Sequence, residues 1–514
     1  MSQIAVNNLT FYYEGSFDNI FDDVSFSIDT NWKLGFIGRN GKGKTTFLNL
    51  LLGKYEYKGT IRTSVAFDYF PYQILPEYRK QCAADFFTIL KSDSELWKVI
   101  CELDQLQADT EILYRPFYTL SYGERTKVML SVLFSGEHDF LLIDEPTNHL
   151  DQDSREIVKS YLAEKQGFIL VSHDRDLLDA CVDHVLVLNR STIEVQSGNF
   201  SSWWENKIRK DAYSMAENEK HKKEIQKLKR AVGRTRQWAE QNENTKIGFD
   251  PVKDPGHKGK RAYIGAKTKK MQSRVKQMEN RIAAKIEETE GLLEDMEQPA
   301  ELKLMPLKYH KEVLISARDY GLQYADVAVF QHLQMELRRG ERVFLCGKNG
   351  CGKSSLIQSI LSHIDTGETA VEPARGMKST AMAEEGILTA ASGLIVSYVN
   401  QDTSFLKGDI LEFCRQRQLD QTLFFSVLRQ LDMERVQFSK KLEDFSQGQK
   451  KKVLLAASLI MPAHLYIWDE PLNYIDLFSR IQIEELILKY QPTMLMVEHD
   501  RRFQEKIATK IVNL

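Results

Sequence analysis

The chain has few of the features that mark secreted, membrane-spanning or zinc-containing proteins. Its six cysteines are scattered over 514 residues without a CxxC pair, which argues against a disulfide framework and a zinc module and is typical of a reducing compartment. No apolar run approaches the roughly 18 residues that a membrane helix needs. The first residues lack a basic segment followed by a long apolar core, so we expect no signal peptide and a cytoplasmic location.

The net charge is also small, at −3, but it conceals a separation of charges. Residues 207–285 contain 23 Lys and Arg against 9 Asp and Glu, a balance of +14, so the remainder carries −17. An apolar content of 42% over this length is enough for about two to four domains with buried cores. The sequence therefore predicts an acidic body with a strongly basic middle.

Two glycine-rich loops of the form GxxxxGK[ST] lie 309 positions apart. Each follows a short apolar run, at 34–37 and 343–346, and precedes an apolar helical pattern. In this context the backbone N–H groups surround a polyphosphate, the lysine meets the β- and γ-phosphates, and the hydroxyl ligates Mg²⁺. The expected ATP-binding residues are Gly38, Asn40, Gly41, Gly43, Lys44, Thr45 and Thr46 in the first loop, and Gly347, Asn349, Gly350, Gly352, Lys353, Ser354 and Ser355 in the second.

Pairs of acidic residues end the apolar runs 140–143 and 465–468. Such runs predict buried parallel strands that deliver acids to their carboxyl ends, where α/β sheets bind ligands. We expect Asp144 and Asp469 to hold Mg²⁺, together with Thr45 in one half and Ser354 in the other. Glu145 and Glu470 would polarise the attacking water.

Weaker signals occur in the same order in both halves. Histidines after the next strands would contact the γ-phosphate, glutamines after earlier strands would reach Mg²⁺ or the attacking water, and tyrosines before the loops would stack on adenine. Taken singly, these residues have ordinary structural explanations: a core histidine, a loop glutamine, an edge tyrosine. The candidates are Tyr13, Gln73 and His173 in the first half and Tyr324, Gln401 and His499 in the second.

A serine opens a predicted helix in each half, with a glycine two positions on. Its hydroxyl, the free N–H groups and the positive end of the helix dipole favour a γ-phosphate, although such a serine alone is usually an N-cap. The residues concerned are Ser121 and Gly123, and Ser446, Gly448 and Gln449.

The spacing of these features makes coincidence negligible. Serine to glutamate is 24 residues in both halves, glutamate to histidine is 28 and 29, and glutamine to serine is 48 and 45. Lysine to glutamine is 29 against 48, which indicates an insertion of some 19 residues near 376–393, whose role is not readable. Residues 74–119 have helical spacing and predict a small helical subdomain. The fold class is therefore α/β, with two tandem P-loop domains.

Between the halves, residues 203–243 contain no proline and one glycine, and 271–286 repeat apolar residues at coiled-coil spacing. The stretch 244–265 contains two prolines and four glycines and predicts a loop. Together they predict a helical hairpin whose arm of about 40 residues is about 60 Å long. A solvated linker is the alternative, but the charge favours a phosphate backbone. The basic residues at and beyond the tip are Lys258, Lys260, Arg261, Lys267, Lys269 and Lys270. The predicted domains are 1–200, 201–300 and 301–514.

With both halves described, the chain resembles the ATP-binding cassette (ABC) superfamily. The tandem cassettes, the lack of membrane segments and the basic helical linker are similar to the ABC-F family of ribosome-acting ATPases. Residues 31–35, 71–73 and 468–476 resemble the Lsa-type antibiotic-resistance members of that family. The departures from the family pattern, such as Tyr122 and Gln447 in the signatures, predict two non-equivalent sites.

The resemblance implies that the cassettes close head to tail on two ATP molecules with Mg²⁺. It implies a single chain that acts on the 70S ribosome, with the linker at large-subunit rRNA and exit-site tRNA. There it would help to remove lincosamides, pleuromutilins and streptogramin A. The alternatives are a housekeeping ABC-F translation factor and, from another class, the ATPase subunit of a drug exporter, which the +14 segment does not favour. A DNA-repair ATPase would need zinc modules or much longer coiled coils.

Overall fold

The computed structural model describes residues 2–13, 19–136, 139–148, 150–189, 191–244, 273, 276–277, 280–282, 302–324, 327–364 and 382–514. The chain divides into two units, Met1–Trp203 with Ala300–Leu514, and Trp204–Pro299. The first unit contains both cassettes. Over the described ranges, no helix combines the length and the hydropathy that crossing a bilayer requires.

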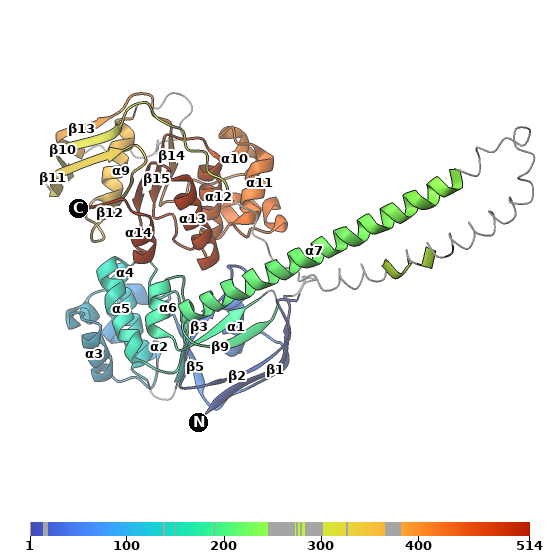
Figure 1. The fold of residues 1–514 in the computed structure, drawn as a ribbon. Helices are drawn as coiled ribbons and strands as arrows, with labels where there is room; N and C mark the ends of the chain where they lie inside the picture. Colours follow the sequence, from blue (N-terminus) through green and yellow to red (C-terminus); the bar gives the residue numbers. More distant parts are fainter. Residues whose placement is uncertain are drawn as a thin grey trace, which may run out of the picture. The chain divides into compact units, whose positions relative to one another are not determined.

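A six-stranded sheet forms the centre of the first cassette (Figure 1). In spatial order the strands are β5 (Ala66–Phe70), β6 (Asp139–Asp144), β7 (Phe168–Val171), β3 (Lys33–Ile37), β8 (His184–Leu188) and β9 (Ile193–Ser197). Neighbouring strands run parallel except the last pair, β8 and β9, and the apolar residues of the central strands are buried, as predicted for the run 140–143. The helices that follow β3, β6 and β7 are α1 (Lys44–Leu51), α5 (Gln152–Glu164) and α6 (Arg175–Cys181).

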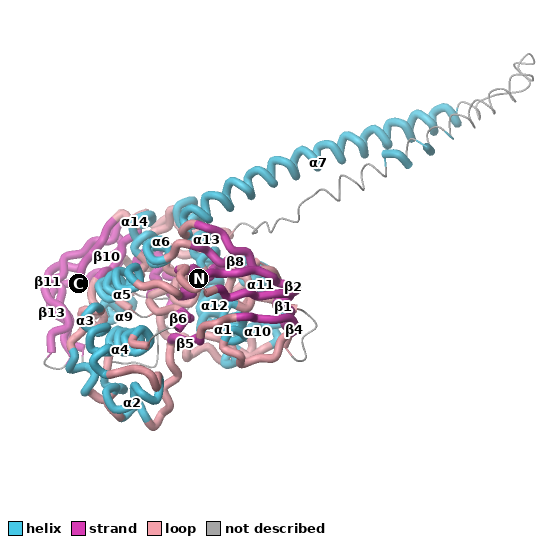
Figure 2. Tube along the Cα trace, turned by 90° about the horizontal axis from the view of Figure 1, so that it is seen from below, coloured by secondary structure: helices cyan, strands magenta, loops and turns pink. Residues whose placement is uncertain are grey.

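An antiparallel sheet of three strands packs against α1 and the central sheet through a shared apolar core. Its strands, in the order β2 (Phe21–Asp29), β1 (Gln3–Phe11) and β4 (Lys58–Arg62), lie side by side in Figure 2. The predicted helical subdomain has its own core. It consists mainly of α2 (Ala83–Leu90) and α3 (Leu96–Gln105), with short 3₁₀ turns at Tyr78–Lys80, Thr110–Tyr114 and Phe117–Thr119, and it leads into α4 (Tyr122–Phe134).

The second cassette repeats this arrangement, which confirms the predicted tandem α/β fold. Its parallel sheet has the order β14 (Val396–Val399), β15 (Leu465–Asp469), β16 (Met494–Val497), β12 (Arg342–Cys346) and β17 (Lys510–Asn513). Its antiparallel sheet has the order β11 (Val327–Arg338), β10 (Val313–Tyr324) and β13 (Met382–Ala390). The helices are α9 (Lys353–Ser362), α10 (Ile410–Gln416), α11 (Gln421–Gln430), α12 (Gln447–Ile460), α13 (Leu477–Tyr490) and α14 (Arg501–Ile507), with 3₁₀ turns at Arg435–Ser439 and Leu442–Asp444.

The predicted insertion contributes to this second antiparallel sheet. Strand β13 pairs with β10 as β4 pairs with β1 in the first cassette. The described part of the insertion is therefore an element of the cassette fold, while residues 365–381 lie outside the described residues.

The second unit begins within a single long helix, α7 (Phe200–Asn244). At about 1.5 Å per residue, its 45 residues make a rod of about 68 Å. Of the predicted returning helix, residues 273, 276–277 and 280–282 are described and are helical. The predicted tip loop and its six basic residues, from Lys258 to Lys270, lie outside the described residues.

Candidate active site

The first P-loop joins β3 to α1 and forms what we call site 1. Gly41 and Gly43 have φ values of 82° and 112°, a region that favours glycine. A Cβ on Gly43 would lie 2.6 Å from the side chain of Ile20. The buried Lys44 ammonium bonds the Gly38 carbonyl at 2.6 Å and the Asn40 Oδ1 at 3.1 Å. The loop thus curls around its own lysine at the N-terminus of α1, the geometry that binds phosphate.

A hydroxyl and a carboxylate meet beside this loop. Thr45 Oγ1 lies 3.2 Å from Asp144 Oδ2 at the end of β6. Burial raises the pKa of Asp144, and the hydrogen bonds from Tyr69 and Thr45 oppose that shift. These hard oxygen donors, next to a phosphate-binding loop, fit a Mg²⁺ ion.

Glu145 follows Asp144 and turns sharply, with a φ of 52°. Burial and the neighbouring Asp144 carboxylate raise its pKa to about 8. His173, at the end of β7, places its Nε2 3.3 Å from Glu145 Oε1 and 3.0 Å from Asn40 Oδ1. Burial and the nearby Lys44 lower the pKa of His173, which favours a neutral imidazole. The structure therefore brings the predicted lysine, glutamate and histidine together.

Site 2 has the same plan around the second P-loop. Lys353 bonds the carbonyls of Gly347 at 2.8 Å and Lys348 at 2.9 Å. Burial and Glu470 raise the pKa of Asp469 to about 6, and a hydrogen bond from Ser354 opposes the shift. The hydroxyl and carboxylate of site 1 are thus repeated here.

The second glutamate is more fully bonded than the first. Glu470 Oε2 accepts hydrogen bonds from Gln401 at 2.8 Å and from Asn473 at 2.6 Å, and His499 Nε2 lies 3.7 Å from Oε1. Burial alone would raise the pKa of Glu470, but its contacts with His499, Lys451 and Gln401 hold it below the usual value. The two catalytic candidates therefore differ in their electrostatic environment.

The two halves also differ at the predicted glutamines. Gln401 contacts the glutamate of site 2, whereas Gln73 is exposed in the loop after β5. From β5, the hydroxyl of Tyr69 contacts an acid of site 1 and donates to Asp144 Oδ2 at 3.1 Å. Of the tyrosine candidates, Tyr13 lies beside the first loop, with its hydroxyl 2.9 Å from Thr46 Oγ1. Tyr324 ends β10, and its side chain lies outside the described residues.

Both signature serines cap their helices. Ser121 and Glu124 form a reciprocal capping box at the start of α4, and Ser446 and Gln449 form one at the start of α12. A Cβ on Gly448 would lie 2.9 Å from the Tyr474 carbonyl, and one on Gly123 would lie 3.5 Å from Ser154 Oγ.

Each P-loop faces residues of the opposite cassette. A cavity of about 460 Å³ at site 2 is lined by Lys353, Ser354 and Glu470 from the second cassette and by Tyr122 and Arg155 from the first. Gly350, Gly352, Ser355, Asn349, Gln401 and His499 complete most of its lining. Its volume is within the range of small-molecule sites. At site 1, Asn40 Nδ2 donates to the Tyr474 carbonyl at 2.9 Å.

Several buried charges at this junction were not among the predicted site residues. Lys452 on α12 pairs with Asp476 at 3.2 Å, and both are buried. Arg480 on α13 donates to the His173 carbonyl of the other cassette at 3.0 Å. The sequence does carry a signal for them, because Asp151 with Arg155 repeats as Asp476 with Arg480 at the same spacing.

Two P-loops, each with a hydroxyl, two strand-end carboxylates and a histidine, define a tandem P-loop ATPase. The profile of the ABC transporter family matches residues 21–148 and 330–473, and the chain belongs to that family. It binds and hydrolyses ATP, as predicted.

Two curated relatives align with this chain over nearly all of its length. The ribosome protection protein VmlR of Bacillus subtilis (strain 168) is 26% identical over 513 residues, which cover 96% of this chain and 84% of the relative. ABC transporter F family member 2 of Arabidopsis thaliana is 23% identical over 100% of this chain and 76% of its own length. These relatives bear out the resemblance to ABC-F proteins.

Solved structures show the same fold. The structure named RNase-L Inhibitor aligns with a TM-score of 0.60 at 16% identity, over 99% of this chain and 87% of that chain. The archaeal ribosome recycling factor aABCE1, in a complex with ribosomal stalk protein aP1, aligns with a TM-score of 0.59 at 17% identity. The alignment covers 98% of this chain and 87% of that chain.

Proposed function

We propose that this chain is a ribosome-acting ABC-F ATPase that protects the large subunit from antibiotics of the peptidyl-transferase centre. Lincosamides, pleuromutilins and streptogramin A are the drug classes concerned. The observation that carries the proposal is the +14 segment at 207–285, inserted between two ATPase cassettes and opened by a helix of 45 residues. A relative over nearly the whole chain is named a ribosome protection protein.

Within each site, different residues bind the phosphates and activate the attacking water. Lys44 and Lys353 hold the β- and γ-phosphates, and the strand-end glutamates Glu145 and Glu470 orient and polarise the attacking water. Thr45 and Asp144 at site 1, and Ser354 and Asp469 at site 2, would hold Mg²⁺, which would neutralise negative charge on the phosphates. The opposite cassette completes each site, with Ser446 and Gly448 at site 1 and Ser121 and Gly123 at site 2.

Closure on two ATP molecules couples the cassettes to the linker. Each γ-phosphate is held by both halves at once, so hydrolysis at a site removes the contacts shared across that site and allows the halves to part there. In the closed state the basic tip, from Lys258 to Lys270, lies at rRNA near the exit-site tRNA and disturbs the drug pocket. Contacts of this kind go mainly to phosphates and depend on salt.

The test is the double substitution Glu145→Gln and Glu470→Gln, which retains ATP but does not hydrolyse it. We expect the variant to co-sediment with ribosomes in ATP and not in ADP. A doubly substituted protein that stays in the supernatant at moderate salt would contradict the ribosomal proposal.

Drug susceptibility distinguishes protection from a housekeeping role in translation. We expect cells that express the chain to tolerate more lincosamide or pleuromutilin than cells that express the double variant. Unchanged susceptibility combined with ATP-dependent ribosome binding would identify a housekeeping ABC-F factor instead.

A further inference from the structure

The two faces between the cassettes can be compared residue by residue. Residues from 107 to 159 match those 325 positions later, for example Asp151 and Asp476. The offset is 309 at the P-loops and 326 from His173 onward. We call the contacts around the first P-loop face 1 and those around the second P-loop face 2. Every contact on one face therefore has a definable counterpart on the other.

Two ion pairs tie the first P-loop to the helical subdomain of the second cassette. Arg39 lies 3.3 Å from Asp432, and Lys42 lies 3.2 Å from Glu434. Both acids follow α11, in the turn where Asp432 has a φ of 64°. Face 1 is thus held by charge directly at the phosphate-binding loop.

A third pair lies deeper in the same face. Both guanidinium NH groups of Arg175, at the start of α6, bond the carboxylate of Glu484 on α13, with Arg175 Nη1 3.2 Å from Oε2. The side chains are 9% and 0% exposed, so water screens this pair very little. Planar, bidentate pairing of this kind fixes geometry as well as adding energy. Face 1 therefore has a buried anchor behind its P-loop contacts.

The counterparts on face 2 cannot form these pairs. Lys348 and Gln107 replace Arg39 and Asp432, and Cys351 and Asp109 replace Lys42 and Glu434. Only one residue of each counterpart pair is charged: Lys348 in the first and Asp109 in the second. The sequence therefore removes both P-loop ion pairs from face 2.

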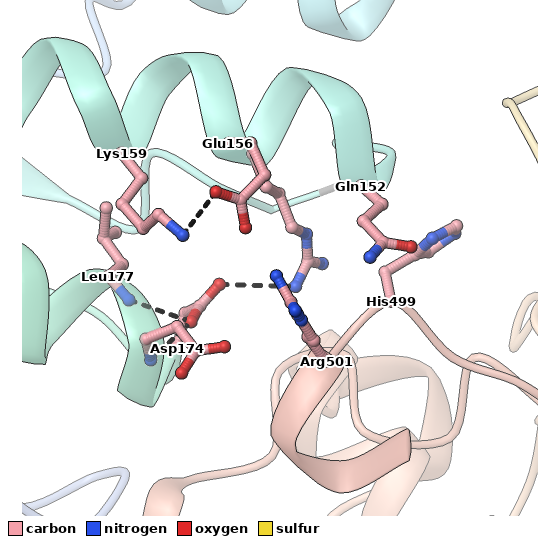
Figure 3. Close-up of a pocket in the computed structure, with 9 residues that line it drawn as sticks. Gln152, Glu156, Lys159, Asp174, Leu177, His499 and Arg501 are labelled. Atoms are coloured by element: carbon pink, nitrogen blue, oxygen red, sulfur yellow. Dashed lines mark hydrogen bonds and ion pairs between the residues drawn. The ribbon is translucent and has the colours of Figure 1, made fainter. Parts of the chain in front are cut away.

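The buried anchor is replaced by two like charges. Arg501 occupies the position of Arg175, and Lys159 occupies that of Glu484. Each is instead paired on its own helix, Lys159 with Glu156 and Arg501 with Glu505 at 2.8 Å. Figure 3 shows Arg501 approaching α5 from α14, while Lys159 turns along its helix to Glu156. These two cations cannot form the ion pair that the equivalent residues make on face 1, and Arg501 is attracted to the first cassette by the neighbouring carboxylates of Glu156 and Asp176 instead.

One further group of ion pairs joins α14 of the second cassette to α6 of the first. Arg502 on α14 pairs with Asp176 and, at 2.6 Å, with Asp179 on α6. Arg502 and Asp176 are each other's counterparts, so this pair belongs to neither face alone.

We propose that the ion pairs of face 1 form a one-sided latch, so that site 1 stays closed through the ATPase cycle while the cassettes open and exchange nucleotide at site 2. The latch consists of Arg39–Asp432, Lys42–Glu434 and Arg175–Glu484. The cavity at site 2, lined from both cassettes, lies on the face that lacks it. This inference concerns the ATPase cycle and stands whether or not the ribosome is the partner.

Matched spin labels measure the two faces in the full chain after its native cysteines have been replaced. One pair, at Lys54 and Val436, spans face 1, and the equivalent pair, at His363 and Glu111, spans face 2; all four residues are exposed. In the Glu145→Gln and Glu470→Gln background, we expect Mg-ATP to shorten the face 2 distance and to leave the face 1 distance unchanged. Equal changes on the two faces would overturn the proposal.

Exchanging the latch residues supplies the matched variants. Glu484→Lys gives face 1 the residue of face 2, and we expect the face 1 distance to become nucleotide-dependent. Lys159→Glu places an acid opposite Arg501, and we expect it to shorten the face 2 distance without nucleotide and to slow release of a fluorescent ATP from site 2 by about tenfold. Because Lys159→Glu alters a partly exposed residue, it tests the proposal even if Glu484→Lys fails to fold. No effect of Lys159→Glu on either quantity would refute the latch.

Discussion

At the scale of the residue, the junction between the cassettes depends on buried charges that satisfy one another. Asp476 caps α13, accepting from the Ser479 N–H at 3.0 Å, and its other oxygen meets Lys452 at 3.2 Å. Burial would raise the pKa of Asp476, but Lys452 and the cap hold it at about 2, against an ordinary value of 3.8. A carboxylate in this position is worth about 2 kcal/mol of stability when it is ionised.

We predict that Asp476→Asn destabilises the protein by about 3 kcal/mol, because asparagine keeps the cap but leaves Lys452 buried without its partner. Since the folded pKa lies below the unfolded value, the contribution of Asp476 is present above about pH 4 and is lost as the pH falls toward 2. Urea unfolding at several pH values measures the free energy of unfolding of the variant and of the native protein. The difference between the two should become smaller below about pH 4.

The matched control is Asp151→Asn, which makes the same change at the equivalent cap in the first cassette and likewise keeps the cap. Asp151 is partly exposed and caps α5 through Ser154. We expect a change within about 0.5 kcal/mol. Equal losses for the two variants would mean that the pairing of Asp476 with the buried Lys452 contributes nothing to stability.

At the scale of the element, the antiparallel sheets of both cassettes contain the same irregularity. Strand β1 has Asn8 at a φ of 49°, and β10 has Asp319 at 48°, each at a shift of register. A glycine of the neighbouring strand lies against each of these residues. A Cβ on Gly59 would lie 2.4 Å from the Asn8 carbonyl oxygen, and a Cβ on Gly386 would lie 2.0 Å from the Asp319 carbonyl oxygen. Only a residue without a side chain leaves room for these bulges.

We predict that Gly386→Ala destabilises the second cassette by about 3 kcal/mol, because the new methyl group meets backbone that cannot move without breaking the β10–β13 pairing. Gly340→Ala is the control, since Gly340 has nearly the same φ, 82° against 81°, with nothing within 4 Å of its Cβ position. There we expect about 1 kcal/mol. Calorimetry that finds equal losses would assign the whole effect to the dihedral angle.

At the scale of the whole molecule, charge is divided between the parts of the chain. The basic balance of residues 207–285 and the acidic balance of the remainder keep the net charge near zero. This division directs the basic segment toward polyanions and keeps the cassettes from binding them along their whole surface.

We predict that changing the six basic residues Lys258, Lys260, Arg261, Lys267, Lys269 and Lys270 to glutamine weakens ribosome binding and leaves ATP hydrolysis without ribosomes unchanged. The slope of log affinity against log salt should fall by about 0.7 to 0.9 for each phosphate contact removed. Co-sedimentation at a series of salt concentrations measures it. An unchanged slope would exclude these residues from the RNA contact, and the same change at the exposed cassette residues Lys58, Lys80 and Lys441 serves as the control.

The sequence was sufficient for the parts of the site that are local. Glycines, lysine and hydroxyl of each P-loop follow one another within eight residues, and strand-end acids are marked by the apolar runs before them. Strand topology then brings Thr45 to Asp144 and His173 to Glu145 because parallel strands end at the same edge of the sheet. The role predicted for Gln73 was a weaker inference, because no periodic pattern indicates which way the side chain of a loop residue points.

What the sequence by itself determined is the repeated α/β cassette, the P-loop and strand-end acids of each ATP site, and the basic composition of the middle segment, because all of these are set by local composition and spacing. Only the tertiary structure decided which charges of one half meet the other: Arg175 with Glu484, and Arg480 with the backbone of His173. These partners lie some 300 positions apart, and their pairing depends on how two folded surfaces meet, for which no local pattern carries information.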